Sequence, residues 1–369
     1  MKFYVIAGEA SGDLHASNLM KALKSEDSET QFRFWGGDLM NTQSPNIIKH
    51  YKDLAFMGFT EVLLNLRTIK ANLSFCKQDL LEYNPDALIL VDYPGFNLRI
   101  AKFAKSKGIK VFYYISPKVW AWNQKRAIKI KACVDEMFTI FPFETKFYQK
   151  YNVDVNYVGH PLLDAIDNIS FSNNEKDRFL SKNKLSNKSI IALLPGSRKQ
   201  EVTRILSEML SVQSYFPDYQ FVIAGAPSLH IEFYKTFLSD NTTIIFDQTY
   251  DLLKIAEAAL VTSGTATLET AIFNVPQVVC YKAGTLTYQI AKRLINVKFI
   301  SLVNLILNKE AVAELIQDDL NTNRISEELH KILGPKKKQQ LNDYKKLREL
   351  LGGHGASAKT ASLMLKTLN

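Results

Sequence analysis

Short, continuous apolar runs alternate with amphipathic segments along almost the whole chain. The apolar runs predict β-strands; they read KFYVIA, FRFWG, ALILVD, KVFYYIS, EMFTI and VNYVG and, after a break, IIALLPG, QFVIAG, TIIF, ALVTSG and QVVCY. Runs of this kind are typical of parallel strands that are buried on both faces. Segments such as ASNLMKALKS and VTRILSEMLSVQSYF have helical periodicity. The repeated strand–helix order predicts a doubly wound α/β fold.

A polar, lysine-rich segment at residues 168–188 interrupts this pattern and contains few large apolar residues. We interpret it as a linker region between two Rossmann-like domains, at 1–167 and 189–334, with basic helices following at 335–369. A chain of 369 residues is long enough for two cores. We expect the domains to face a cleft, with ligands beyond the carboxyl ends of the strands.

Composition narrows the class of protein modestly. Three distant cysteines without a CxxC pair indicate neither a disulfide framework nor a zinc cluster. Residues 1–7 do not resemble a secretory signal, and no apolar run reaches the roughly 18–20 residues of a membrane span. We therefore expect a cytoplasmic protein. The net charge is +9, and eight Lys or Arg against two acids give residues 335–369 a balance of +6. Either an anionic partner or a solvated lysine face explains this tail.

The first predicted strand leads into GEASGDLH, residues 8–15. Its two glycines do not have the G-x-G-x-x-G spacing of a dinucleotide site. Glu9, Ser11 and Asp13 are placed to hydrogen-bond a ligand. The alternative is an ordinary helix start that Ser11 or Asp13 caps.

Asp92 follows the run ALILV, at the carboxyl end of a predicted strand. A carboxylate beside apolar residues has a raised pKa and can act as a general base. The sequence DYPG is also good turn chemistry, so a structural aspartate is the alternative.

Two stretches after strands of the second half suggest a nucleotide diphosphate site. In ALVTSGTATLE, Ser263, Gly264 and Thr265 stand between a strand and a helix, where amides and the helix dipole favour anions. Glu269, one turn on, can accept hydrogen bonds from ribose hydroxyls. No Walker lysine is present. In LLPGSRKQ, the guanidinium of Arg198 suits a diphosphate, with a surface salt bridge as the alternative.

Two further stretches have two interpretations each. In SPKVWAWNQKR, Trp120 and Trp122 alternate with basic residues. This suits nucleic acid, but no nucleic-acid motif accompanies it, so we favour the wall of a cleft that offers cations to a phosphate. Residues 57–75 carry an apolar helical stripe with basic neighbours, which pattern alone assigns to the core and which also suits a helix lying on a membrane.

Several motifs recur together in one order: AGEASGDLH, VDYPGFN, SPKVWAWNQKR, FPFE, VGHPLLDA, LLPGSRKQEV, SGTATLE and AKRL. In this set the chain resembles the lipid-A-disaccharide synthase family over almost its whole length. The resemblance implies a metal-independent, cofactor-free inverting glycosyltransferase of the GT-B type, with two Rossmann-like domains. It implies transfer of 2,3-diacylglucosamine from its UDP derivative to the 6-hydroxyl of 2,3-diacylglucosamine 1-phosphate, giving a β-linked disaccharide 1-phosphate and UDP in lipid A biosynthesis.

The resemblance also implies roles for the residues above. Asp92 would be the catalytic base. The donor site would contain Arg198, Ser263, Gly264, Thr265, Glu269 and, by its match to a family position, Asn304, while Glu9 and Ser11 would face the sugar or the acceptor. Asn308 and Lys309 depart from a Gly-Arg pair that is common in the family.

The implied partners are lipids rather than nucleic acid. With acylated substrates, the protein would lie peripherally on the cytoplasmic face of the inner membrane of a Gram-negative bacterium and contact it through residues 57–75. Family members exchange C-terminal segments in a homodimer, which the basic tail would do here. The alternatives are another GT-B enzyme of UDP-sugars (an epimerase or a transferase with a soluble acceptor) and a non-catalytic nucleotide-binding protein.

Overall fold

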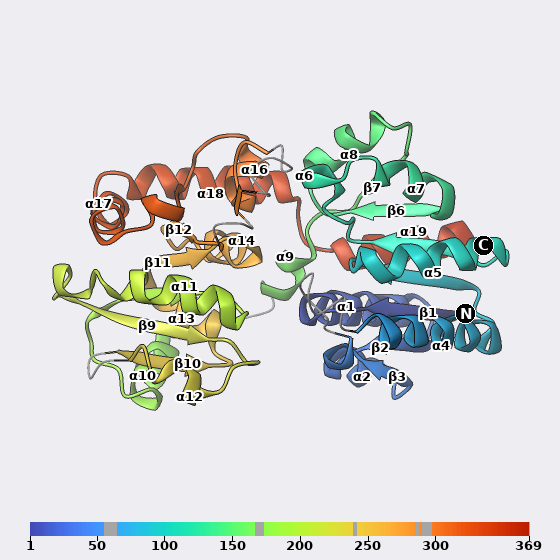
Figure 1. Ribbon diagram of the computed structural model, residues 1–369, viewed down its shortest axis with the longest axis horizontal. Coiled ribbons are helices and arrows are strands. Elements are labelled where there is room, and N and C mark those ends of the chain that lie inside the picture. Colours follow the sequence, from blue (N-terminus) through green and yellow to red (C-terminus); the bar gives the residue numbers. More distant parts are fainter. Residues whose placement is uncertain (55–64, 167–172, 239–241, 285–287, 290–296, 369) are drawn as a thin grey trace. The chain divides into compact units, whose positions relative to one another are not determined.

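The computed structural model describes residues 1–54, 65–166, 173–238, 242–284, 288–289 and 297–368. The chain forms two compact units (Figure 1). Unit 1 comprises Met1–Asn168 together with Leu351–Asn369, and unit 2 comprises Ile169–Leu350. Each unit is an α/β fold with one parallel sheet, as the alternating pattern predicts.

The sheet of unit 1 has the strand order β3-β2-β1-β4-β5-β6-β7, and its pairs are parallel. The strands are β1 (Lys2–Ala7), β2 (Gln31–Gly36), β3 (Ile47–His50), β4 (Ala87–Val91), β5 (Lys110–Tyr114), β6 (Glu136–Thr139) and β7 (Asn156–Tyr157). The chain first winds from β1 toward one edge and then returns to β4 beside β1. Because both directions start at the centre, the sheet has its switch point between β1 and β4.

Helices of unit 1 cover both faces of this sheet (Figure 1). Around the first crossover lie α1 (Ala10–Glu26), α2 (Asp38–Gln43), α9 (Pro161–Ile166) and α19 (Ala356–Leu368), with α1 and α9 each packed against α19. A second group contains α4 (Leu66–Tyr83), α5 (Pro94–Ser106) and α7 (Arg126–Cys133), in which α5 packs against both α4 and α7. The short α6 (Val119–Trp122) and α8 (Pro142–Gln149) flank β6 in sequence. Right-handed crossovers in two winding directions place helices on opposite faces, which is why all of β4 and, after the exposed Lys2, the rest of β1 are buried.

The sheet of unit 2 has the order β10-β9-β8-β11-β12-β13. The strands are β8 (Ser189–Leu194), β9 (Tyr219–Gly225), β10 (Thr243–Phe246), β11 (Ala256–Thr262), β12 (Gln277–Tyr281) and β13 (Ala313–Ile316). The helices are α10 (Asn173–Lys182), α11 (Lys199–Leu210), α12 (Ile231–Tyr234), α13 (Thr249–Ile255), α14 (Thr265–Ile272), α16 (Leu302–Leu307), α17 (Thr322–Leu333) and α18 (Lys337–Leu351). The switch point of this sheet lies between β8 and β11.

Alternate residues of β8 enter two different cores, one on each face of the sheet. Ile191 and Leu193 pack in the core that α11 and α17 cover. Ile190 and Ala192 pack in the other core, to which α10 and α13 contribute. Continuous apolar strands are therefore a direct consequence of two-sided burial.

The strand runs named in the sequence all form strands, but two strands were not predicted. These are β3 and β13, and both are sheet edges of four residues. Neither is fully buried on both sides: every residue of β3 and three residues of β13 are only partly covered. The other two edge strands, β7 and β10, were predicted because their runs carry no charge, whereas Lys49, His50 and Glu314 interrupt the apolar pattern of β3 and β13.

Two predicted segments have a more specific structure than their composition indicates. In the linker region 168–188, residues 173–182 form α10, and Phe179 and Leu180 pack in a core of unit 2. In the basic C-terminal segment, α18 lies in unit 2 except for its last residue, and α19 packs in unit 1.

The attachment of α19 to unit 1 depends on Asp164 of the VGHPLLDA motif. Its carboxylate accepts hydrogen bonds from the amides of Gly355 (2.7 Å) and Ser357 (2.9 Å), at the start of α19. The amide of His160, four residues earlier, donates to the carbonyl of Leu351. Capping of this kind contributes roughly 0.5–2 kcal/mol. Exchange of this segment between two chains stays a prediction.

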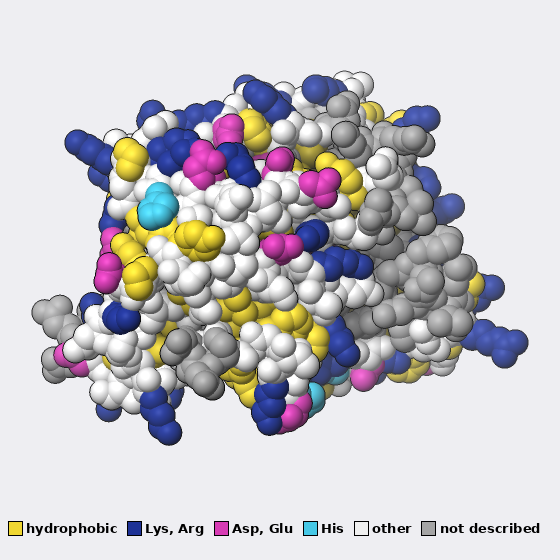
Figure 2. Space-filling model, turned by 60° about the vertical axis from the view of Figure 1, so that its left-hand side comes forward, with side chains coloured by type: hydrophobic (Ala, Val, Ile, Leu, Met, Phe, Trp, Pro, Cys, Tyr) yellow, Lys and Arg dark blue, Asp and Glu magenta, His cyan; other side chains and the backbone are white. Residues whose placement is uncertain are grey.

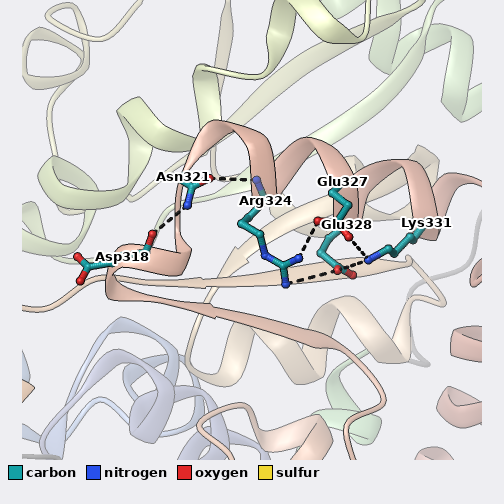
Figure 3. A network of polar contacts seen from close by, with 6 residues as sticks. All are labelled: Asp318, Asn321, Arg324, Glu327, Glu328 and Lys331. Carbon is teal, nitrogen blue, oxygen red and sulfur yellow. Dashed lines mark hydrogen bonds and ion pairs between the residues drawn. The ribbon is translucent and has the colours of Figure 1, made fainter.

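Most charged side chains outside the strand ends are exposed or paired. On the face in Figure 2, Lys and Arg side chains are scattered along the margins, with acidic side chains among them. Helix α17 gives the clearest network (Figure 3): Arg324 bonds Glu327 at 2.7 Å, and Lys331 bonds both Glu327 and Glu328. Lys331 and Arg324 lower the pKa of Glu327 through these bonds.

Candidate functional site

The backbone of Asp92 is held in an uncommon conformation at the carboxyl end of β4. Asp92 and Tyr93 have φ values of 43° and 47°, in the left-handed region that non-glycine residues rarely adopt. The Asp92 carbonyl accepts from the side chains of Asn97 (2.8 Å) and Tyr113, and its amide donates to the carbonyl of Tyr114 (3.2 Å). Strain of this kind costs about 1–3 kcal/mol and persists only where surrounding contacts fix it.

The side chain of Asp92 is half-buried and lies near two charged groups. The pKa of Asp92 is raised to about 6, chiefly by desolvation and in addition by the negative charge of Glu9, while the positive charge of Lys118 and the amide of Tyr93 oppose this shift. Glu9 follows β1 and Lys118 follows β5, so all three residues lie beyond the ends of neighbouring strands. Such a carboxyl changes its protonation near neutral pH, as a general base requires.

The turn after β1 is shaped by its packing against the turn after β4. A Cβ atom added to Gly8 would lie 2.4 Å from the ring of Tyr93, so only glycine lets these turns meet. Glu9 is the N-cap of α1 but makes no side-chain cap bond, and Ser11 in the first turn is exposed. Glu9 and Asp92 thus stand on the two sides of the switch point, where ligands of such sheets bind.

Asp13 has a structural role that differs from the expected one. It is buried, and its carboxylate accepts from the amides of Gly37, Leu39 and Met40, at the start of α2. The alternative that Ser11 or Asp13 caps α1 is therefore wrong, because Asp13 caps a different helix. It joins α1 to α2 and has little capacity left for a ligand.

In unit 2, the chain that leaves β11 at the switch point leads directly into α14. Gly264 is the N-cap of α14 and provides no side chain for its first amides. An added Cβ at Gly264 would meet no atom within 4 Å, and Thr265 is exposed. The hydroxyl of Ser263 donates to the carbonyl of Ile300 (2.9 Å). The start of α14 is therefore open to an anion, with the orientation that the helix dipole favours.

Arg198 lies on the neighbouring side of the same switch point, after β8. Gly196, with a φ of 112°, turns the chain there, and Arg198 is the N-cap of α11. Its guanidinium is 58% exposed and 3.4 Å from the carboxylate of Glu201. An exposed pair of this kind is worth about 0–1 kcal/mol. The expected salt bridge exists, and it is weak enough for a phosphate to replace it.

Glu269 lines a cavity of about 460 Å³ with Tyr250, Gln248 and Asp247. Burial raises the pKa of Glu269 to about 7, and a hydrogen bond from Tyr250, at 3.5 Å, opposes this shift. A carboxylate in a polar cavity one turn into α14 can accept hydrogen bonds from the hydroxyls of a sugar.

Asn304 is fully buried, and its side chain is already saturated with hydrogen bonds. Its oxygen accepts from the amides of Ala311 (2.7 Å) and Val312 (3.0 Å), and its nitrogen donates to the carbonyl of Val312 and to Glu314. No atom of this side chain remains for a nucleotide, so we leave Asn304 out of the donor site.

Asn304 instead helps to fix the turn before α14, through its hydrogen bond to Glu314. The carboxylate of Glu314 accepts from the amides of Ile300 (3.0 Å) and Ser301 (2.9 Å), and the Ile300 carbonyl accepts from Ser263. Asn304 is thus a positioning residue in a chain of contacts that ends at the start of α14. Nothing in its sequence position distinguishes this role from ligand contact.

The departures at 308 and 309 keep the local geometry. Asn308 ends α16 with a φ of 52°. Glycine adopts this left-handed conformation most easily, and asparagine adopts it more readily than most other residues. Lys309 forms an ion pair with Asp343 of α18 at 2.5 Å.

Two predicted surfaces are described only in part. Residues 57–64 lie outside the described residues. In the remainder of that stretch Leu66 is 44% exposed, Phe75, its last residue, is 47% exposed, and Ile69 and Leu73 are half-buried. Trp120 is buried against Phe143, while the side chain of Trp122 is outside the described part.

The described ranges contain neither a metal-binding cluster nor a membrane-spanning helix. In those ranges no group of three or more His, Cys, Asp or Glu side chains could hold a metal ion. Across the same ranges, every helix is too short or too polar to span a bilayer.

Comparison with known proteins gives consistent matches over the whole chain. Residues 3–367 match the family model described as Lipid-A-disaccharide synthetase. Proteins named lipid-A-disaccharide synthase from Syntrophus aciditrophicus and Trichlorobacter lovleyi are 40% and 37% identical to it, and each alignment covers 98% of this chain and 96% of the relative.

Solved structures show the same fold at low sequence identity. The UDP-GlcNAc 2-epimerase from Neisseria meningitidis, bound to UDP-GlcNAc, matches with a TM-score of 0.69 and 14% identity, covering 99% of this chain and 100% of that one. At this identity the likeness shows the two-domain fold of GT-B glycosyltransferases and related epimerases, and no more.

Proposed function

The chain belongs to the lipid-A-disaccharide synthetase family, and from this premise we propose how its residues carry out the reaction. It is a UDP-sugar-dependent glycosyltransferase of lipid A biosynthesis. The single observation that carries this conclusion is the family match across residues 3–367. The proposed substrates are UDP-2,3-diacylglucosamine as the donor and 2,3-diacylglucosamine 1-phosphate as the acceptor.

Asp92 is the proposed base. The 6-hydroxyl oxygen of the acceptor attacks the anomeric carbon of the donor on the face opposite UDP. The bond from that carbon to the diphosphate oxygen breaks, and its electron pair leaves with UDP. The hydroxyl proton passes to the Asp92 carboxylate. The raised pKa of about 6 supports this role, because the group is ionised at neutral pH yet close enough in pKa to accept a proton.

The donor is held by unit 2 in this proposal. The open amides at Gly264 and Thr265 and the guanidinium of Arg198 stabilise the negative charge that develops on the diphosphate. Glu269 accepts hydrogen bonds from the ribose, and Ser263 keeps the turn in place. These groups are the ones proposed to neutralise the leaving UDP.

Glu9 and Ser11 complete the proposal on the side of unit 1. Ser11 is exposed at the first turn of α1 and can hydrogen-bond the sugar or the acceptor. Glu9 acts on the charge of Asp92. We also propose that the stretch 57–75 contacts the cytoplasmic leaflet of the inner membrane. The exposed Leu66 of α4 and the net charge of +9 support contact with an anionic surface.

The test is release of UDP from purified full-length enzyme in detergent micelles. We expect release from UDP-2,3-diacylglucosamine only when 2,3-diacylglucosamine 1-phosphate is also present, with one disaccharide formed per UDP. Conversion of UDP-GlcNAc alone would instead support an epimerase. Folded protein that releases no UDP with both lipids present would disprove the transferase.

A further inference from the structure

A groove between α5 and α7 lies in unit 1 beside the turn that contains Asp92. It has a volume of about 680 Å³, within the roughly 300–1,000 Å³ that ligand sites have. One wall is a stripe of α5 at helical spacing, Pro94, Leu98 and Lys102. The other is a stripe of α7, with Lys129 and Cys133. The groove is therefore a built surface between two packed helices.

The floor of the groove is apolar and its rim is cationic. Leu98, Ala132 and Cys133 contribute the floor, and five basic residues contribute the rim: Arg99, Lys102, Lys105, Arg126 and Lys129. None of the described residues that line it is acidic. Lys105 is neutralised by Asp135 at 2.5 Å, just outside the groove. The positive charges of Arg99, Lys102 and Lys129 make the rim complementary to a multiply charged anion.

The charges of this rim act on the floor itself. Burial raises the pKa of the Cys133 thiol, while the positive charges of Lys105 and Lys102 oppose that shift. The ammonium group of Lys102 is thus within electrostatic reach of the groove floor. Two nearby lysines have different surroundings: Lys107, the C-cap of α5, lies over the ring of Phe103, at 5.9 Å, and Lys131 of α7 does not line the groove.

The groove also begins next to the proposed base. Pro94 follows Asp92 by two residues, so their Cα atoms are at most about 7.6 Å apart. One end of the groove therefore lies close to the backbone of Asp92, within unit 1.

We propose that this groove binds the phosphate and the adjoining acyl chain of the acceptor glycolipid. This inference rests on the proposed function, and it assigns the phosphate to Arg99, Lys102 and Lys129, which lie outside the family motifs quoted above. The apolar floor suits an acyl chain, and Lys102, Lys129 and Arg99 suit the phosphate. Uncharged or purely apolar ligands do not need such a rim.

The test compares two double variants with the same change of charge. In the groove variant, Lys102→Gln is combined with Lys129→Gln. In the control variant, Lys107→Gln, at the C-cap of α5, is combined with Lys131→Gln, in α7; neither residue lines the groove. Both are assayed in detergent micelles with 2,3-diacylglucosamine 1-phosphate and with 2,3-diacylglucosamine, which lacks the phosphate.

We expect the groove variant to raise KM for the phosphorylated acceptor by roughly 10- to 30-fold, the effect of losing two charge-assisted contacts. Its kcat and its affinity for UDP stay at the wild-type level, and so does its KM for the acceptor without phosphate. The control variant keeps the wild-type KM for both acceptors. If the glutamine substitutions perturb folding, a second variant with arginine at both positions keeps the positive charge. We expect this variant to have the wild-type KM.

Three results would overturn the proposal. The first is an unchanged KM in the groove variant, and the second is an equal rise in the control variant. The third is a groove variant that loses only its sedimentation with vesicles containing phosphatidylglycerol, which would make the groove a membrane contact. In each case the wild-type enzyme still releases UDP, so a failure of this proposal is distinct from a failure of the proposed function.

Discussion

The two units have parallel sheets wound in the same way, but the strand ends at their switch points present opposite kinds of polar group. At the end of β4 in unit 1, Asp92 presents a desolvated carboxylate with a raised pKa. At the end of β11 in unit 2, Gly264 leaves the amides of α14 uncapped. One end accepts a proton and the other attracts negative charge. The difference teaches that the fold supplies the position, and local residues supply the chemistry.

The same contrast is visible between Asp92 and the acidic residues of α17. Glu327 has a lowered pKa because Lys331 and Arg324 bond it in water-exposed surroundings (Figure 3). Among the described residues, the cation that acts on Asp92 is Lys118, and the carboxylate of Glu9 is also near it. Paired carboxylates on a surface stay ionised, whereas a half-buried, poorly compensated one is able to exchange protons near neutral pH.

The largest expected effect comes from removing the charge at the unit 1 strand end. Asp92→Asn should lower kcat by about 10³-fold, within the range for general-base catalysis, while UDP affinity is unchanged. In the wild type, kcat/KM should fall as the pH falls through about 6, where Asp92 becomes protonated. The variant should show no such inflection. Wild-type kcat in Asp92→Asn would exclude it as the base.

The same substitution should increase stability. The pKa of Asp92 is raised from 3.8 to about 6 in the folded protein, so the folded state binds more protons than the unfolded state between these values. The contribution of Asp92 to stability therefore declines as the pH rises from about 4 to about 6. Asp92→Asn should raise the free energy of unfolding at pH 7 by about 1–3 kcal/mol. Chemical denaturation measures this, and destabilisation would contradict it.

The next effect is expected in unit 2, at Arg198, which follows β8 at the switch point of the sheet. Arg198→Ala should weaken UDP binding by roughly 30-fold, the effect of losing a charged hydrogen-bond donor to phosphate. Calorimetric titration with UDP measures it. Glu201→Gln is the matched control, since it breaks the same ion pair without removing the guanidinium, and it should leave UDP affinity unchanged or slightly higher. Equal losses in both variants would assign Arg198 a structural role.

A smaller effect is expected at Glu269, whose pKa is raised to about 7. Its ionised form is the better acceptor for ribose hydroxyls, so UDP affinity of the wild type should fall as the pH falls through 7. Glu269→Gln should lower UDP affinity by about 10-fold at pH 8 and remove this pH dependence. A wild-type pH profile in the variant would place the ribose elsewhere.

The smallest effect tests how Asp92 is positioned. Tyr113→Phe removes one of two side-chain donors to the Asp92 carbonyl, so kcat should fall by about 3- to 5-fold, less than the cost of a whole hydrogen bond. KM and the pH inflection of the wild type should be retained. A shifted inflection with unchanged kcat would mean that Tyr113 acts on the charge of Asp92 rather than on its position.

Much of this molecule was predictable from short-range patterns. The buried strands follow from continuous apolar runs, because two-sided burial excludes polar residues from them. The glycine-rich turns and Asp92 follow from their place after strands. The edge strands β3 and β13 were not predictable in this way, since one free edge permits polar residues. Asp13 and Asn304 could not be assigned either, because a ligand contact and a backbone contact require the same polar side chains.

By itself, the sequence determined the alternation of strands and helices, the family, and which residue types stand at the strand ends. Only the tertiary structure decided which of these polar groups are already engaged. Asp13 caps α2, Asp164 caps α19 and Asn304 holds a loop, whereas the Asp92 carboxylate and the start of α14 remain available. Hydrogen bonds between residues far apart in sequence make this distinction, and a linear pattern contains no record of them.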